Sequence, residues 1–341
     1  MSVRDARLVL RSSPHDRGAA DTPGIMRDVL LALVPITIAA VFYFGVAAVL
    51  VIGGAIAGCV ATEAFFAPRG RLFASLTDGS ALLTGLLLGL TLPPCFPVWM
   101  AFIGGMAAVG MGKVVWGGLG HNLFNPALVG RAFLQAAFPT AITTWSPQGS
   151  RELAIYASNL AVPFMKAPVD AVTTATPLGL MKFQGLDTPL WNLVIGDTPG
   201  SLGETSALLI LLGGLYLLRK RAFDWRIPVG ILLTVAVFAG IVWAVGPEGT
   251  PNPLFMLSSG GLMLGAIFMA TDPVTSPMAP MGTWIYAAGI GVLVVLIRLW
   301  GGLPEGVMYA VLLMNAATPL INRGFRPTPF GRGKKAKEDA P

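Results

Sequence analysis

The sequence predicts an all-α integral membrane protein with ten transmembrane helices, arranged as two inverted five-helix repeats with broken helices. Composition is the first observation behind this prediction: 54% of the 341 residues are hydrophobic and 12% are charged. An average soluble protein has about twice that charged fraction. So few polar groups cannot cover a soluble globule of this size, and the chain is too apolar to be disordered.

Long stretches without charge are the second observation. Residues 29–62 and 79–112 each contain 34 residues without Asp, Glu, Lys or Arg. Because a bilayer core needs about 20 helical residues, each stretch predicts two spans joined by a tight turn. The ten predicted spans are 28–45, 47–66, 79–93, 97–113, 122–138, 205–218, 227–246, 254–271, 282–299 and 304–321. The third to sixth spans are short and rich in Gly or Pro, which is typical of broken helices that line a site near the midplane.

The positions of the basic residues are the third observation. On this topology 18 of the 23 Lys and Arg residues lie on one side, which the positive-inside rule makes cytoplasmic. Both termini are then cytoplasmic, which requires an even number of spans. The other five include Arg131, within a predicted span, and Arg298, at the outer end of another. The bases lie in short clusters between apolar runs, so membrane lipid rather than nucleic acid is the expected partner.

This topology divides the chain into five regions. They are a cytoplasmic N-terminal tail (1–27), a first five-helix half (28–138), an external, periplasmic loop (139–204), a second five-helix half (205–321) and a cytoplasmic C-terminal tail (322–341). An acid-x-Ser-Ala-Leu-Leu pattern begins at Asp78 and again at Glu204. Because each half has an odd number of spans, the second would insert upside down relative to the first. Chance similarity between helices rich in Leu, Gly and Ala is the alternative explanation.

The sequence lacks the common motifs of nucleotide-binding and zinc enzymes. There is no Walker A motif, no Rossmann glycine pattern after a strand and no H-E-x-x-H, so we expect no catalytic residue, no NAD site and no metal site. Cys59 and Cys95 are too few for a disulfide framework or a cysteine-ligated zinc. They are interpreted as small apolar residues. The alternative is that they supply half the ligands of an iron–sulfur cluster shared with another chain.

The external loop contains the most unusual segment, Asp170-Ala-Val-Thr-Thr-Ala-Thr-Pro-Leu178. On residue type alone it reads as a solvated turn, or as an attachment point for a phosphoester. It resembles the flavinylation motif Asp-x-x-Ser/Thr-Gly-Ala-Ser/Thr, whose last hydroxyl carries FMN. The resemblance makes Asp170 the acid, Thr173 the first hydroxyl, Ala175 the alanine and Thr176 the acceptor. Thr174 stands where many such motifs have Gly.

Three further segments extend this resemblance over about residues 12–322. Ser13-Pro14-His15, the Gly117–Arg131 segment and the Met269–Pro277 segment resemble the D subunit of the Rnf (Rsx) complex, in the NqrB/RnfD family. That resemblance implies a flavin-carrying subunit in the bacterial inner membrane. Its complex transfers electrons between ferredoxin and NAD and translocates Na⁺ or H⁺. The implied partners are the A, B, C, E and G subunits and an external flavin transferase. The B subunit of the sodium-pumping NADH:quinone reductase, and a non-redox solute channel or transporter, are the alternatives.

Polar residues near the inner membrane boundary complete the candidate sites. The resemblance implies a second, non-covalent flavin (riboflavin), for which Asn122 and Asn125 are the candidate ligands; a polar helix cap is the alternative reading. Asp78, Asp272 and Glu63 are candidates for an ion path, because ionisable groups in an apolar context are functional candidates by default. For Asp272, which precedes Pro273, termination of a helix is the other interpretation.

Overall fold

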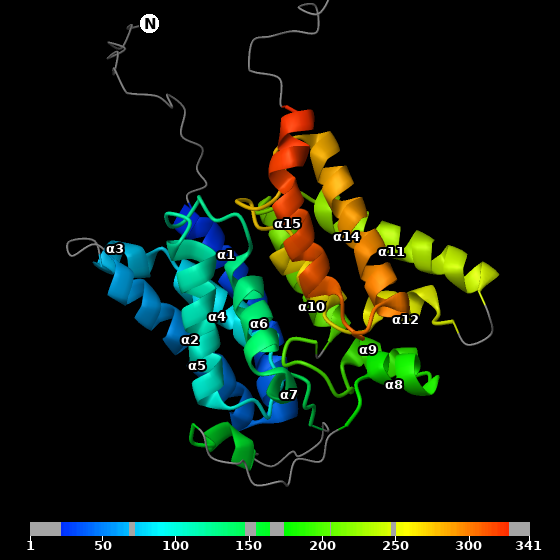
Figure 1. Cartoon of the computed structure of the whole chain (residues 1–341), viewed down its shortest axis with the longest axis horizontal. Helices are drawn as coiled ribbons and strands as arrows, with labels where there is room; N and C mark the ends of the chain where they lie inside the picture. The colour runs from blue at the N-terminus through cyan, green and yellow to red at the C-terminus, as the bar shows by residue number, and fades with distance from the viewer. Residues whose placement is uncertain are drawn as a thin grey trace, which may run out of the picture.

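The computed structural model describes residues 22–67, 72–146, 155–163, 174–204, 206–246 and 250–326 (Figure 1). Within these ranges the chain forms helices and no β-strand, so the predicted all-α class is confirmed there. The first group of helices is α1 (Thr22–Phe44), α2 (Val46–Phe66), α3 (Leu72–Thr77), α4 (Ser80–Leu90), α5 (Val98–Val109), the π-helical turn η1 (Gly110–Val114) and α6 (Pro126–Ala137). The second group is α10 (Ala207–Lys220), α11 (Arg226–Val245), α12 (Pro253–Ser258), α13 (Leu262–Leu264), the π-helical turn η3 (Gly265–Met269), α14 (Pro280–Trp300) and α15 (Val307–Gly324).

Four helices of the described part of the chain, α1, α2, α11 and α14, are long and apolar enough to cross a membrane. Their mean hydropathy lies between 1.9 and 2.3. Each of the ten predicted spans coincides with at least one helix, but the other helices do not meet the criteria of length and hydropathy together. The structure therefore supports a membrane protein, and the count of ten crossings stays a prediction.

The helices pack in the same order within the two groups (Figure 1). In the first group α2 packs against α4 and α5, and α5 packs against α6. In the second group α11 packs against α12 and α14, and α14 packs against α15. The two groups meet where α1 contacts α10 and where α6 contacts α15. The equivalence of the two groups as an inverted repeat stays a prediction.

Small residues bring the backbones of α2 and α5 into direct contact. A Cβ atom at Gly58 would overlap the backbone oxygen of Phe102, and one at Gly105 would overlap the backbone oxygen of Ala55. Apolar lipid tails compete with apolar side chains, so close backbone packing is a main source of helix association in membranes. This crossing fixes the relative position of the first-group helices.

Gly58→Ala is therefore expected to destabilise the protein, whereas Gly53→Ala on the same helix is not. Alanine stabilises a helix by about 1 kcal/mol relative to glycine at both positions. At Gly58 the added methyl group collides with the α5 backbone, and such overpacking costs about 1–3 kcal/mol. At Gly53 nothing lies within 4 Å of the added atom. Thermal unfolding of both variants in detergent measures the difference, and equal melting temperatures would contradict the assignment of this crossing.

The span predicted over residues 254–271 is not continuous. After α12 ends at Ser258, the chain is interrupted at residues 259–261, where Gly260 has a φ of +65°, and it resumes in α13. Glycine adopts this left-handed conformation at little cost, which makes the interruption possible. Arg298 of α14 donates to the carbonyl oxygens of Met256 and Ser259, which the interruption leaves without helical partners. This explains why a basic residue is found at the outer end of α14.

The described parts of the external loop contain four short helical segments. They are α7 (Pro139–Ile142), the 3₁₀ turn η2 (Ala157–Leu160), α8 (Pro177–Gln184) and α9 (Leu190–Ile195). The side-chain amide of Asn159 donates to the carbonyl oxygens of Pro94 and Phe96, both at 2.9 Å. The backbone nitrogen of Leu202 donates to the carbonyl oxygen of Leu92 at 3.0 Å. The loop is thus bound to the connection between α4 and α5, where it closes one end of the helix bundle.

Candidate functional site

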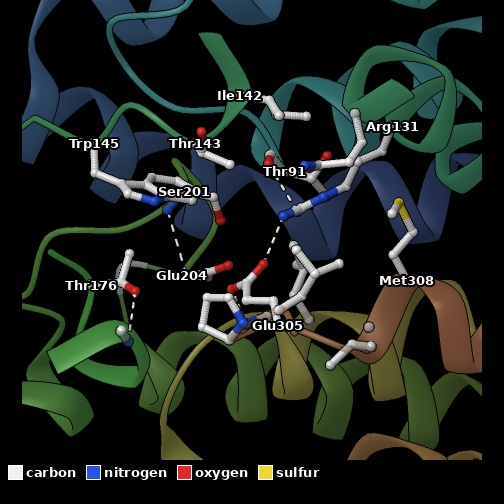
Figure 2. Close-up of a pocket in the computed structure, with 18 of the residues that line it drawn as sticks. Thr91, Arg131, Ile142, Thr143, Trp145, Thr176, Ser201, Glu204, Glu305 and Met308 are labelled. Atoms are coloured by element: carbon white, nitrogen blue, oxygen red, sulfur yellow. Dashed lines mark hydrogen bonds and ion pairs between the residues drawn. The ribbon is translucent and has the colours of Figure 1, made fainter. Parts of the chain in front are cut away.

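A cavity of about 470 Å³ lies under the loop, where the two helix groups meet (Figure 2). The end of α4, α6, the external loop and the start of α15 all contribute to its wall. We call it the outer cavity. The polar residues that line it include Thr91, Arg131, Thr143, Thr174, Thr176, Ser201, Glu204 and Glu305.

Thr176 lies in the wall of the outer cavity, with 7% of its surface exposed. It is the N-cap residue of α8, and its Oγ accepts a hydrogen bond from the backbone nitrogen of Gly179 at 3.2 Å. Its φ of −67° and ψ of 157° confirm the extended conformation that Pro177 predicts. Thr174 and Ala175 line the same cavity. The other two residues of the attachment motif, Asp170 and Thr173, lie outside the described residues.

A partly buried ion pair forms part of the wall of the outer cavity. Arg131 of α6 donates to the carbonyl oxygen of Thr91 at 2.9 Å and to Oε2 of Glu305 at 2.7 Å. The side chains are 11% and 20% exposed, respectively. An arginine in an apolar span is costly unless a carboxylate and further hydrogen bonds compensate its charge. The exceptional charge within the predicted span 122–138 therefore belongs to this cavity.

Glu204 adds a second carboxyl group beside Glu305. Burial raises the pKa of the Glu204 carboxyl well above its usual range, and the nearby Glu305 carboxylate raises it further. Oε1 of Glu204 is buried and accepts no hydrogen bond from the described residues. Glu204 and Glu305 therefore form a pair of adjacent carboxyl groups, and such a pair does not readily ionise at both members.

A second cavity of about 80 Å³ lies near the C-terminal end of α10. We call it the inner cavity. Among the residues that line it are Ser80, Lys113, Asn122, Asn125, Leu217, Phe223, Phe268 and Asp272. Neighbouring residues of the chain line different cavities: Met269 lines the outer and Phe268 the inner, and on α6 the same is true of Leu128 and Ala127.

The two predicted flavin ligands of the inner cavity differ in their free hydrogen-bonding capacity. Asn125 is the N-cap of α6: its Oδ1 accepts from the backbone nitrogen of Ala127 at 3.0 Å, and its Nδ2 donates to the carbonyl oxygen of Met269 at 3.0 Å. The structure thus supports the helix-cap reading for Asn125. Asn122 donates to the carbonyl oxygen of Phe124 at 3.3 Å, while its buried Oδ1 has no partner among the described residues. Only Asn122 retains an unused polar atom.

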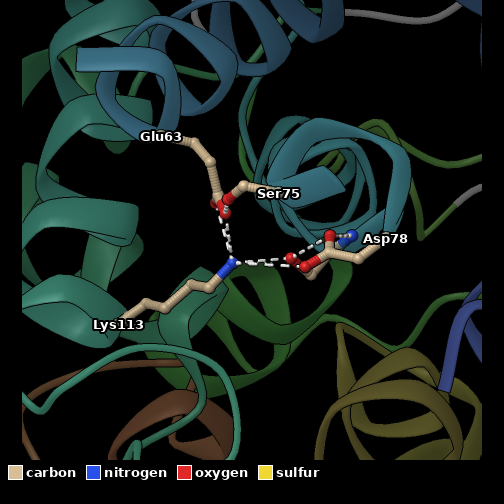
Figure 3. A network of polar contacts seen from close by, with 5 residues as sticks. Glu63, Ser75, Asp78 and Lys113 are labelled. Atoms are coloured by element: carbon tan, nitrogen blue, oxygen red, sulfur yellow. Dashed lines mark hydrogen bonds and ion pairs between the residues drawn. The ribbon is translucent and has the colours of Figure 1, made fainter. Parts of the chain in front are cut away.

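The acids predicted for an ion path divide into two places. Glu63 and Asp78 lie around the ammonium group of Lys113 (Figure 3). Asp272 lines the inner cavity in the turn that follows η3, and its Oδ1 accepts from the backbone nitrogen of Val274 at 3.1 Å, as in an Asx turn. Glu63 and Asp78 are therefore not isolated charges, because the single positive charge of Lys113 lies beside both.

Sequence reasoning missed Glu204 and Glu305 as cavity residues and Lys113 as a partner of the two acids. The available signal was a charge at the end of an apolar run, which topology alone also explains.

The thiols of Cys59 and Cys95 are free and buried, and they donate to the carbonyl oxygens of Gly105 and Thr144 at 3.4 and 3.1 Å. The described ranges contain no group of His, Cys, Asp and Glu residues that could hold a metal ion.

Comparison with known proteins places these features in a family. The chain is 46% identical over 329 residues to the D subunit of the ion-translocating oxidoreductase complex of Stutzerimonas stutzeri, covering 92% of this chain and 93% of that protein. It is 44% identical to the D subunit of the proton-translocating ferredoxin:NAD(+) oxidoreductase complex of Clostridium ljungdahlii, covering 95% and 96%. It is 40% identical to the D subunit of the Na(+)-translocating complex of Acetobacterium woodii, covering 98% and 99%. The model of the NQR2, RnfD, RnfE family matches residues 9–331, and the chain therefore belongs to that family.

Proposed function

We propose that this chain is the flavin-carrying membrane subunit of a complex that couples electron transfer between ferredoxin and NAD to translocation of Na⁺ or H⁺. One observation carries the proposal: the hydroxyl-bearing residues Thr174 and Thr176 line a cavity of about 470 Å³ beneath the external loop. A solute channel has no need of an attachment motif at such a cavity. The relatives at 44% and 40% identity are named as D subunits of ferredoxin:NAD(+) oxidoreductases, which favours this function over a role in the quinone reductase.

The outer cavity fits FMN in size and in chemistry. Pockets for small molecules and cofactors usually measure about 300–1,000 Å³, a range that includes this cavity. The Oγ of Thr176 is the phosphoester oxygen in this proposal. Arg131 provides positive charge, and Glu204 has a carboxyl oxygen without a partner among the described residues. FMN held there would supply the electron-transfer chemistry, and the protein its position and electrostatic surroundings.

The residues of this chain have distinct roles in the proposal. Thr176 holds the cofactor at the start of α8. Arg131 stabilises negative charge within the cavity, and its own position is fixed by Thr91 and Glu305. Glu204 places a second carboxyl group beside Glu305 in the cavity wall. No residue of this chain binds NAD in the proposal, because the sequence has no dinucleotide fingerprint.

The inner cavity does not fit riboflavin within the walls that this chain provides. Its volume of about 80 Å³ is well below the lower limit of about 300 Å³ for small-molecule pockets. Both polar atoms of the Asn125 amide also already have partners, in the helix cap and in Met269. The second flavin therefore stays a sequence-based prediction, and no step of the proposed function depends on it.

The remaining parts of the proposal concern the assembly. The A, B, C, E and G subunits are the proposed partners, and a flavin transferase outside the membrane attaches FMN to the external loop. We place the chain in the bacterial inner membrane with both termini in the cytoplasm, because the basic residues are concentrated on that side.

Intact mass spectrometry of the purified full-length chain tests the proposed function. We expect a mass increase equal to one FMN phosphoester, together with flavin fluorescence that survives denaturation in SDS. A chain with the mass of the bare polypeptide, purified from cells that contain an active flavin transferase, would refute the flavin-carrying function.

A further inference from the structure

The strongest feature that the proposed function leaves unused is the buried ammonium group of Lys113. Its Nζ donates to Oε1 and Oε2 of Glu63 at 2.7 and 2.8 Å and to Oγ of Ser80 at 2.7 Å. Oδ2 of Asp78 lies 3.9 Å away (Figure 3). Lys113 and Glu63 are each 5% exposed. We call the oxygen atoms of Glu63, Asp78 and Ser80 around this ammonium the oxygen cage.

The oxygen cage has the chemistry of a site for a hard cation. All its ligand atoms are carboxylate or hydroxyl oxygens, which such cations prefer. Hydroxyl groups also donate hydrogen bonds to the two carboxylates. Ser75 donates to Oε1 of Glu63 at 2.6 Å, and Ser80 donates to Oδ1 of Asp78 at 2.7 Å. The two carboxylates and the single ammonium leave a net charge of −1. The cage therefore still attracts cations while Lys113 occupies it.

The inner cavity offers the ammonium group a second position. Lys113 and Ser80 line this cavity, so the lysine side chain lies between the cage and an open volume of about 80 Å³. The same cavity contains the carboxyl group of Asp272. Asn122, which is 5% exposed, also lines it with an Oδ1 atom that has no hydrogen-bond partner among the described residues. A buried acceptor without a donor is costly, and an ammonium group can satisfy it.

We infer that Lys113 is a tethered cation, and that a mobile monovalent cation occupies the oxygen cage when the lysine ammonium moves into the inner cavity. The exchange conserves charge at the cage, since one positive charge leaves as another enters. Its role in transport rests on the proposed ion coupling, whereas cation binding to the cage does not. The flexible four-carbon stem of lysine suits this role, and the rigid fork of arginine does not.

Sodium binding to the full-length chain in detergent tests this inference. The chain is purified in choline chloride and titrated with NaCl at constant ionic strength, with Na⁺ binding followed by ²³Na NMR. Lys113→Met empties the cage of its resident cation, so we expect this variant to bind Na⁺ at least about tenfold more tightly than the unmodified chain. In Lys113→Met/Glu63→Gln, which lacks one cage carboxylate, the gain should be lost. Equal affinity of Lys113→Met and the unmodified chain, or full binding by the double variant, would overturn the inference.

Two further variants separate the tethered cation from a general effect of charge. Arg226→Met removes a base from the more exposed pair with Asp224 and should leave Na⁺ affinity unchanged. Asn122→Asp places a carboxylate in the inner cavity and keeps Lys113, so it should draw the ammonium from the cage and raise Na⁺ affinity. This second variant retains all the groups of the cage and tests the inference even if Lys113→Met fails to fold. Unchanged Na⁺ affinity in Asn122→Asp would refute the second position.

These measurements fail independently of the proposed function. The FMN phosphoester is read from intact mass and Na⁺ affinity from NMR, on the same purified chain. A flavin-bearing chain without the Na⁺ effects would refute the tethered cation alone, and a flavin-free chain with them would refute the flavin-carrying function alone.

Discussion

Thr176→Asn is expected to abolish covalent FMN while leaving α8 intact. Asparagine is as good an N-cap residue as threonine, so the hydrogen bond to the backbone of Gly179 can be kept. It has no hydroxyl group, and a phosphoester cannot form without one. In-gel fluorescence after SDS denaturation and peptide mapping measure the loss. Electron transfer through the assembled complex should fall steeply, because one flavin is missing.

Two neighbouring variants make this expectation specific. Thr176→Ser keeps both the hydroxyl and the cap and should retain some covalent FMN. Thr176→Val loses both, so it should lack FMN and also lose about 1 kcal/mol of stability from the missing cap. FMN found on Thr173 or Thr174, or undiminished in Thr176→Asn, would refute the assignment of Thr176.

Arg131→Gln is expected to destabilise the protein by about 3–5 kcal/mol, because it leaves Glu305 buried beside Glu204 without a compensating charge. Glu305→Gln leaves the arginine unpaired and should cost a similar amount. The double variant Arg131→Gln/Glu305→Gln carries neither charge and should be clearly more stable than the sum of the two single losses predicts. Chemical denaturation of all four proteins in detergent gives the coupling energy.

Arg226→Gln is a suitable control for this cycle, since its pair with Asp224 is about one-third exposed and should contribute little. Strict additivity of the Arg131 and Glu305 substitutions would show that the two side chains do not interact, contrary to the 2.7 Å contact in the structure.

The features that could be predicted from the sequence are local. Runs without charge located the long helices, because a helix in lipid must be apolar along its whole length. Pro177 restricts the preceding residue, so the extended conformation of Thr176 could be derived from two adjacent positions. The reading of Asn125-Pro126 as a helix start has the same basis, since the Asn caps and the Pro fits the first turn.

The features that could not be predicted depend on distant contacts. Lys113 and Glu63 are 50 residues apart, and Arg131 and Glu305 are 174 residues apart. Without an alignment, each charge reads only as a marker of topology. Gly260-Gly261 did not distinguish a break from a packed helix, because glycine is frequent in both settings. The structure shows the break between α12 and α13, and Arg298 satisfies the carbonyl groups that it exposes.

For the predicted repeat, the short sequence pattern and the helix contacts pair different helices of the two groups. The acid-x-Ser-Ala-Leu-Leu pattern relates the start of α4 to the start of α10. The helix contacts instead relate α2 and α5 to α11 and α14, since these are the most extensively packed pairs in the two groups. A test of the repeat should therefore follow the order of helix contacts rather than this short pattern.

The presence of two cavities, one on each side of a shared apolar wall, has a consequence for the action of a membrane voltage. Phe268 and Met269 are adjacent in the chain, as are Ala127 and Leu128, yet each pair faces both cavities. Where water or polar groups enter from either side, most of the voltage falls across the apolar layer that remains. A charge that crosses only this layer moves through most of the field, which is worth about 2.3 kcal/mol per elementary charge per 100 mV. Electrons or ions that pass between the cavities would therefore generate, or work against, the part of the voltage that falls across this layer.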